Sequence, residues 1–232
     1  MSLVRLFSSW FAVAALLVGC ATTPPQGSVA LSGDVVARHE GRVGVMVTSL
    51  PKVDTAFPGA YCLLCMGVAA AANSSLTAHT HTLGTDEVAS YKPQLIAGLR
   101  KKGFDVTEIP EPLDTSKLPN AQKKAADHPT KDFTSLKAKY GVDKLCVLEV
   151  TQLGIERTYA AYVPTSDPRA VVRGKAYLID LSSNAYDWYQ SVDVAVPAEG
   201  KWDEPPAFPG LTNAYFQAVE KARDLYLGPF KN

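Results

Sequence analysis

Apolar positions in the middle of the chain group into short runs, which predict the strands of a sheet. Residues 41–50 are β-branched and bounded by Gly41 and Pro51, which is typical of a mostly buried strand. Residues 104–109 predict a second strand. A third strand begins near Lys144. Because both of its faces are largely apolar, we expect it in the centre of the sheet.

Two later segments, 171–181 and 185–196, alternate between apolar and polar residues and predict strands with one face on the core. Ser182, Ser183 and Asn184 join them, which predicts an antiparallel hairpin. The expected core positions of the first strand are Val172, Gly174, Ala176 and Leu178. Those of the second are Tyr186, Trp188, Val192, Val194 and Val196.

A helical period appears in three segments. Residues 86–102 carry acids early and bases late, which suits the helix dipole, and Pro93 predicts either a kink or a start near Ser90. A short helix ends at Gly141. The last helix stops at Gly228 and Pro229. Its predicted buried face consists of Leu211, Tyr215, Val219, Ala222 and Tyr226.

These elements predict an α/β (α+β) fold, a single mixed sheet with the order β-α-β-α-β-β-α and helices packed on the sheet. Residues 110–132 are polar and rich in proline, so we expect a long surface connection there. His39 and His128 stand in polar surroundings and are expected to be exposed.

The amino-terminal residues have the pattern of an export signal. A basic residue, Arg5, precedes an apolar run that is too short to cross a bilayer as a helix. The run ends in residues 17–20, Leu-Val-Gly-Cys, which resemble the lipobox of bacterial lipoproteins. This resemblance implies removal of residues 1–19, acylation of Cys20 and, with Ala21 rather than aspartate behind it, sorting to the outer membrane with the domain facing the periplasm.

The segment after the lipobox predicts a tether. Pro24 and Pro25 stiffen it, and no hydrophobic period runs through it. We therefore divide the chain into a signal peptide at 1–19, an acylated cysteine and flexible tether at 20–39, and a periplasmic α/β domain at 40–232. Two or more acyl chains anchor a protein stably, because each buried methylene contributes about 0.8 kcal/mol.

Charge and length exclude some classes of protein. Without residues 1–19 the chain has 22 basic and 23 acidic side chains, a net charge of −1, which provides no basic surface for nucleic acid. Hydrophobic residues make up 47% of the sequence, enough for one substantial core. We find no catalytic motif such as a nucleophile elbow or a phosphate-binding loop, so we expect no enzyme.

Four residues of the domain match a pattern found in a group of bacterial envelope lipoproteins. Gly141 and Asp143 stand before a buried strand, Asp180 ends a later strand, and Trp188 follows a short turn. The chain thus resembles outer-membrane lipoproteins of the neisserial type, whose fold is similar to the amino-terminal domain of TolB and to curli and polysaccharide secretion lipoproteins. The resemblance implies an accessory role in assembly, secretion or activation, with envelope proteins or further copies of the chain as partners, and no catalytic residues.

The segment 61–81 is the main candidate for site chemistry. Cys62 and Cys65 stand three positions apart in a compartment that favours disulfides, so they predict a bridge, two packed thiols or a thiol-exchange pair. We expect Cys146, on its buried strand, to be a small core residue. With His79 and His81, the two cysteines also form a candidate zinc or copper site. The single residue between the histidines does not fit a zinc finger, so we expect no cofactor, with metal as the minority alternative.

Two further stretches are candidates for contact surfaces. Residues 60–72 carry no charge, and we expect them to form a buried helix laid on the sheet or an oligomer contact, with a membrane-interface helix as the alternative. Trp202 and Phe208 stand among prolines, where they could anchor a partner or fold back onto the core. The leading functional hypothesis is a non-enzymatic accessory lipoprotein, and the alternative is a periplasmic metal-binding or thiol-redox lipoprotein.

Overall fold

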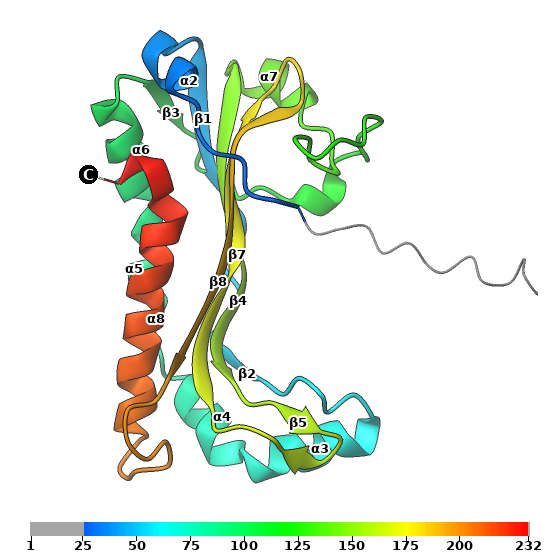
Figure 1. Cartoon of the computed structure of the whole chain (residues 1–232), viewed down its shortest axis with the longest axis vertical. Helices are drawn as coiled ribbons and strands as arrows, with labels where there is room; N and C mark the ends of the chain where they lie inside the picture. The colour runs from blue at the N-terminus through cyan, green and yellow to red at the C-terminus, as the bar shows by residue number, and fades with distance from the viewer. Residues whose placement is uncertain (1–25, 232) are drawn as a thin grey trace, which may run out of the picture.

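The computed structural model describes residues 26–231, so the predicted signal peptide and Cys20 lie outside the described residues. A six-stranded sheet forms the middle of the molecule, and helices lie on both sides of it (Figure 1). Its strands are β1 (Arg42–Val47), β2 (Asp54–Ala56), β3 (Asp105–Glu108), β4 (Lys144–Glu156), β7 (Arg169–Asp180) and β8 (Ala185–Pro197). The α-helices are α2 (Gly33–Arg38), α3 (Leu63–Ala72), α4 (Ser74–Thr80), α5 (Asp86–Ala89), α6 (Tyr91–Lys101), α7 (Ser135–Tyr140) and α8 (Pro209–Leu227). A separate hairpin consists of β5 (Tyr159–Ala160) and β6 (Val163–Pro164).

The sheet is mixed, which confirms the predicted fold class. Its strand order is β3-β1-β4-β7-β8, and β2 pairs with the far end of β4. Strand β1 pairs in parallel with β3 and with β4, and β2 also pairs in parallel with β4. Strands β4, β7 and β8 are antiparallel neighbours. The third predicted strand, β4, is therefore central, as its two apolar faces indicated. The predicted order of elements has two strands before the last helix where the structure has three long ones, β4, β7 and β8. It also lacks the short strands β2, β5 and β6 and the helices α2, α3 and α4.

Apolar residues cover both faces of the upper part of the sheet. Helices α6 and α8 pack on one face, α6 against β1 and β3 and α8 against β7 and β8. The predicted positions Val172, Ala176 and Leu178 of β7 lie in this part of the core. On the other face, Leu136 of α7 and Phe133 pack with Leu145, Val147 and Tyr177. Figure 1 places α5, α6 and α8 on one side of the long strands and α7 on the other. The polar side predicted for β7 is thus partly core, since Tyr177 is buried there.

Helix α8 approaches the sheet closely at one point. A Cβ at Gly174 would lie 2.0 Å from the Glu149 carbonyl oxygen and 2.1 Å from the Tyr226 hydroxyl oxygen. That hydroxyl donates to the Glu149 carbonyl at 3.0 Å, so only glycine leaves room for the helix to bond to β4 across β7. The five positions predicted for the buried face of this helix are all buried.

The structure settles the alternatives around Pro93. Ser90 separates α5 from α6, and Pro93 is the third residue of α6. Proline lacks a backbone N–H group, but in the first turn of a helix that group has no intrahelical acceptor, so α6 can begin at Tyr91 with Pro93 in its first turn. Gly103 follows the last turn with φ +90°, the left-handed backbone expected after a helix.

A local irregularity in β8 changes the side of one predicted core residue. Trp188 pairs with Leu178, but Tyr186 pairs with Ile179, so Asp187 is an extra residue. The bulge rotates Tyr186 onto the face of α7, whereas Trp188 stays on the face of α8. Placing Tyr186 in the same stripe as Trp188 was therefore wrong. The predicted hairpin is correct, and Asn184 takes the left-handed conformation in its turn, with φ 55°.

Residues 26–39, assigned to the tether from the sequence, contact the domain. Val29 forms a bridge with Tyr189 and packs with the core on the α7 side. Ser32 caps α2, and Leu31 and Val35 pack on the α8 side. The packed domain therefore begins before residue 40. Within the described part of the chain, no helix is long and apolar enough to cross a membrane.

Candidate functional site

Helix α3 does not lie on the sheet, which corrects the expectation of a buried helix there. It sits at one end of the molecule beside the β5–β6 hairpin (Figure 1). Only Cys65 and Ala69 of this helix are buried, and they pack against Tyr159 in a small separate cluster. Most of the remaining surface of α3 is open to solvent.

The exposed side chains at this end of the molecule are large and apolar. Tyr61 is 86% exposed, Leu63 85% and Leu64 71%, values that are unusual for side chains of this size. We call the whole set the apolar tip. It comprises Tyr61, Leu63, Leu64, Met66 and Val68 around α3, and Tyr162 and Val163 between and within the strands of the hairpin.

Cys62 and Cys65 are joined by a disulfide, with 4.9 Å between their Cα atoms. Cys62 is the N-cap of α3, and its Sγ accepts a hydrogen bond from the Cys65 backbone N–H at 2.9 Å. Cys62 is exposed, whereas Cys65 is buried. The bridge therefore closes the first turn of α3 and fixes the point where the chain enters the helix.

A buried asparagine fixes the other end of α3 to the body of the molecule. Asn73 Nδ2 donates to the Tyr159 hydroxyl at 2.6 Å, and Asn73 Oδ1 accepts from Arg157 Nη1 at 3.1 Å. A Cβ at Gly59 would lie 1.7 Å from the Tyr159 carbonyl oxygen, so the two segments approach at backbone distance. The apolar tip is thus held rigidly at both ends of its helix.

The two histidines of the candidate metal site have separate partners. His79 Nε2 lies 2.8 Å from Thr212 Oγ1, and burial lowers the pKa of His79, so this side chain is neutral at neutral pH. His81 Nε2 lies 2.8 Å from Asp54 Oδ1. Partial burial opposes ionisation of Asp54, but hydrogen bonds from His81 and from the Thr55 N–H hold its pKa below the ordinary value.

The four candidate metal ligands are not brought together as one set. Among residues 26–231 no group of three or more histidine, cysteine, aspartate or glutamate side chains could hold a metal ion. The thiolates that a zinc or copper site needs are joined in the disulfide. Cys146, the third cysteine of the domain, is a fully buried core residue as predicted, and burial raises the pKa of its thiol to about 12.

Trp202 and Phe208, the candidate partner contacts, fold back onto the domain. Their rings stack in parallel with centroids 6.2 Å apart, and the Arg157 guanidinium lies 4.8 Å from the Trp202 ring. Both side chains are partly buried against the core, and His79 packs on Phe208. The structure therefore gives them a packing role beside the amino-terminal end of α8.

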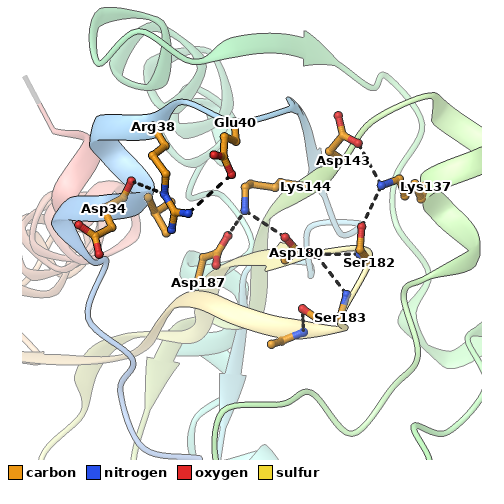
Figure 2. A network of polar contacts seen from close by, with 12 residues as sticks. Asp34, Arg38, Glu40, Lys137, Asp143, Lys144, Asp180, Ser182, Ser183 and Asp187 are labelled. Atoms are coloured by element: carbon orange, nitrogen blue, oxygen red, sulfur yellow. Dashed lines mark hydrogen bonds and ion pairs between the residues drawn. The ribbon is translucent and has the colours of Figure 1, made fainter.

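The motif residues have structural roles at the other end of the long strands, and Figure 2 shows the polar contacts of two of them, Asp143 and Asp180. Asp180 accepts the backbone N–H groups of Ser182 and Ser183, at 2.8 and 3.1 Å, and so forms the hairpin turn. Lys144 lies between the carboxylates of Asp180 and Asp187. Burial disfavours its charge, but these carboxylates raise the pKa of Lys144 above its ordinary value.

Asp143, directly before β4, connects the start of β4 to the start of β1. Its Oδ2 accepts from the Arg42 backbone N–H at 3.0 Å and its Oδ1 pairs with Lys137 Nζ at 3.1 Å, contacts that lower the pKa of Asp143. Gly141 ends α7 in the left-handed conformation. Trp188 packs edge-on against Phe230. The shared pattern therefore marks turns and packing and assigns no chemistry.

The lower half of the sheet exposes a polar face on the side of α7. Glu156 pairs with Arg169 at 2.8 Å and also with Arg173, which in turn pairs with Asp193 on β8. Burial opposes ionisation of Glu156, but the two guanidinium groups hold its pKa below the ordinary value. A cleft of about 480 Å³ opens beside this face, lined by Thr48, Ser49, residues 112–117 and residues 149–151.

Comparison with known proteins gives only distant structural similarities. No protein-family model matches this chain, and no curated protein matches it. A PelC dodecamer from Paraburkholderia phytofirmans is 13% identical over 88% of this chain and 94% of that chain, with a TM-score of 0.34. Protein XCC0632 from Xanthomonas campestris is 13% identical over 89% of this chain and 86% of that chain (TM-score 0.39). Lipoprotein GNA1162 from Neisseria meningitidis is 15% identical over 78% of this chain and 95% of that chain (TM-score 0.28). These values are too low to transfer a function.

Proposed function

We propose that this chain is a periplasmic accessory lipoprotein, anchored in the outer membrane, which is non-enzymatic and supports the assembly, secretion or activation of an envelope complex. The apolar tip carries this proposal. An exposed patch of large apolar side chains on a well-packed domain is typical of proteins that act by contact with a protein or a membrane. The resemblance of residues 17–20 to a lipobox supports the outer-membrane anchor and the periplasm as the compartment in which such a contact would be made.

The test isolates the chain from its own membranes in mild detergent. We expect the mature amino terminus to be acylated Cys20, by mass spectrometry, and the chain to migrate on native gels with at least one other envelope protein or with further copies of itself. We also expect that loss of the chain lowers the amount of that partner in the envelope. A chain that migrates as a monomer and whose loss changes no envelope protein contradicts the accessory role, as does a turnover activity that one substitution abolishes.

One observation favours a second candidate function, thiol–disulfide exchange. Exposed Cys62 stands at the N-cap of α3 and buried Cys65 follows one turn later, an arrangement that stabilises a thiolate at the first position. A thiolate of a partner protein would attack Cys62 Sγ, and the bond to Cys65 would break with its electron pair going to Cys65, which takes up a proton. A second partner thiolate would then attack the partner's own sulfur and release Cys62. The partner is oxidised to a disulfide and this chain is reduced.

A trapping experiment separates this second candidate from a structural bridge. In a Cys65→Ser variant the free Cys62 thiol cannot close its own ring, so exchange predicts a mixed disulfide with another envelope protein on non-reducing gels. The matched control is Cys146→Ser, which removes a buried thiol and leaves the bridge intact. If Cys65→Ser traps no partner, the bridge is structural.

A further inference from the structure

We infer that the apolar tip inserts into the interface of the lipid bilayer in which Cys20 is anchored, as a second membrane contact that orients the domain. This inference rests on the proposed anchor and names the occupant of the apolar tip. The occupant is a lipid surface, for four reasons: the width of the exposed arc of α3, the charge of the segments, their rigidity, and the position of the tip relative to the anchor.

The exposed surface of α3 is too broad for a stripe that faces one partner helix. Positions 63, 64, 66–68 and 70–72 are exposed, and only Cys65 and Ala69 are buried. At about 100° per residue, the exposed positions cover roughly two-thirds of the helix circumference. A rigid protein partner covers one stripe of such a helix, whereas a fluid lipid phase surrounds whatever is exposed.

The apolar tip brings no charge into contact with lipid. Residues 55–78 and 158–166 contain no aspartate, glutamate, lysine, arginine or histidine. The backbone groups within α3 bond to one another, and Asn73 uses its side chain on Tyr159 and Arg157. Tyr61 and Tyr162 supply rings with one polar atom each, which are enriched where membranes meet water.

Both ends of α3 are fixed, so the apolar side chains cannot withdraw into the domain. The disulfide closes the first turn, and Asn73 is held by Tyr159 and Arg157 at the end of the helix. The tip is therefore presented to its surroundings permanently.

The position of the apolar tip suits one membrane plane for anchor and tip. Val29 packs with the core cluster that contains Leu136 of α7, and Figure 1 shows α3 on the same side of the long strands as α7. Cys20 precedes Gln26 by six residues, which span about 20 Å at most. Val29 forms a bridge with Tyr189 of β8, and the residue of β7 that pairs with Tyr189 is Tyr177. The distance along β7 from Tyr177 to the first residue of the strand, Arg169, is about 27 Å. This separation exceeds the reach of the segment before Gln26, so anchor and tip meet one bilayer where that bilayer runs along the α7 side of the long strands, the side on which Val29 and α3 both lie.

The experiment uses the full acylated chain reconstituted into phosphatidylcholine and phosphatidylethanolamine vesicles whose acyl chains carry bromine. A tryptophan is introduced by Leu64→Trp, and its emission is read as the difference from the unmodified chain. We expect the bromolipids to quench most of this emission, and the quenching to be insensitive to salt because no charge takes part. The matched control is Phe216→Trp, an exposed apolar position on α8, where we expect no quenching.

Three outcomes decide the inference. Quenching at position 64 that disappears when Leu63→Ser and Met66→Ser are added supports insertion of the tip. Absence of quenching at position 64 overturns it, and crosslinks from this position to another protein or to a second copy would then name that protein as the occupant. A mature amino terminus without acyl chains would contradict the proposed anchor but not the insertion of the tip. In that case the Leu64→Trp variant is added to the same vesicles, and the quenching of its emission still decides whether the tip inserts.

Discussion

At the scale of single residues, Lys144 has the most demanding environment. Its side chain is 10% exposed and lies between Asp180 and Asp187. We expect Lys144→Met to lower the free energy of unfolding by about 2–3 kcal/mol, because two partly buried carboxylates would face each other without a cation. Asp180 keeps its two backbone N–H donors, which limits the loss. Urea unfolding at pH 7 measures the difference.

The matched control is Lys221→Met, an exposed lysine of α8 for which the described chain shows no ion pair. We expect it to change the stability by no more than about 0.5 kcal/mol. Equal losses for the two variants would mean that the position of Lys144 between the carboxylates contributes nothing.

We expect substitution by alanine to have opposite effects on stability at two glycines. Gly174→Ala would place a methyl group on the Glu149 carbonyl and the Tyr226 hydroxyl, so we expect a loss of about 3 kcal/mol as α8 is pushed off the sheet. A methyl group added at Gly67 of α3 would meet nothing within 4 Å beyond its chain neighbours and the backbone of its own helix, so Gly67→Ala should stabilise by about 0.5 kcal/mol. Thermal unfolding of both variants checks the pair, and a neutral Gly174→Ala would contradict the close contact.

At the scale of elements, α3 should depend on its disulfide locally. A bridge that closes a loop of four residues contributes about 2 kcal/mol at most by restricting the unfolded chain. We expect Cys62→Ser with Cys65→Ser to speed amide hydrogen exchange across Leu63–Ala72 while β4 and α8 keep their protection. In the double variant the serine at position 62 is a good N-cap residue, so we expect α3 itself to be retained. Equal loss of protection in β4 would show that the bridge supports the whole fold.

The sequence predicts those elements whose own pattern decides their place. The buried face of α8 has a clear helical period, and the two apolar faces of β4 indicate a central strand; both agree with the structure. The break at Ser90 follows from proline chemistry. Short pairings such as β5–β6 could not be foreseen, because two residues per strand leave no periodic signal.

The candidate site was predictable in its residues but not in its surroundings. The spacing of Cys62 and Cys65 and the predicted compartment indicated these two residues. The apolar sequence of α3, however, predicts a buried helix. Only the tertiary structure shows that the sheet ends before α3 and leaves it exposed. Tyr162 and Val163 were missed because one tyrosine and one valine in a short segment without a period carry no signal of their own. His128, expected to be exposed, is buried beside Asp127, since the long connection folds onto the α7 side of the domain.

At the scale of the whole molecule, the three long strands continue beyond the apolar cluster on the α7 side, and ion pairs join them on the polar face that they expose there. Glu156 of β4 is 4% exposed and pairs with Arg169 and Arg173 of β7, while Arg173 also reaches Asp193 of β8. If Glu156 loses its charge, the Arg169 guanidinium has no anion left among the described residues and Arg173 keeps only Asp193. The lower half of the sheet should therefore be sensitive to acid.

The sign of this pH dependence follows from the pKa of Glu156, which is lowered in the folded state. A carboxyl group with a lowered pKa stabilises the fold above its unfolded pKa of about 4.3, and the contribution disappears as the pH falls through the folded value. We expect Glu156→Gln to cost about 2 kcal/mol at pH 7, less than for a fully buried pair because Arg169 and Arg173 are partly exposed. The difference from the unmodified chain should narrow steadily below about pH 4. Urea unfolding across this range measures it, with Glu204→Gln, an exposed glutamate, as the matched control. The opposite outcome is a difference in the free energy of unfolding that stays constant down to low pH. Glu156→Gln would then act through the geometry of the amide group, and the charge of Glu156 would not hold the long strands together.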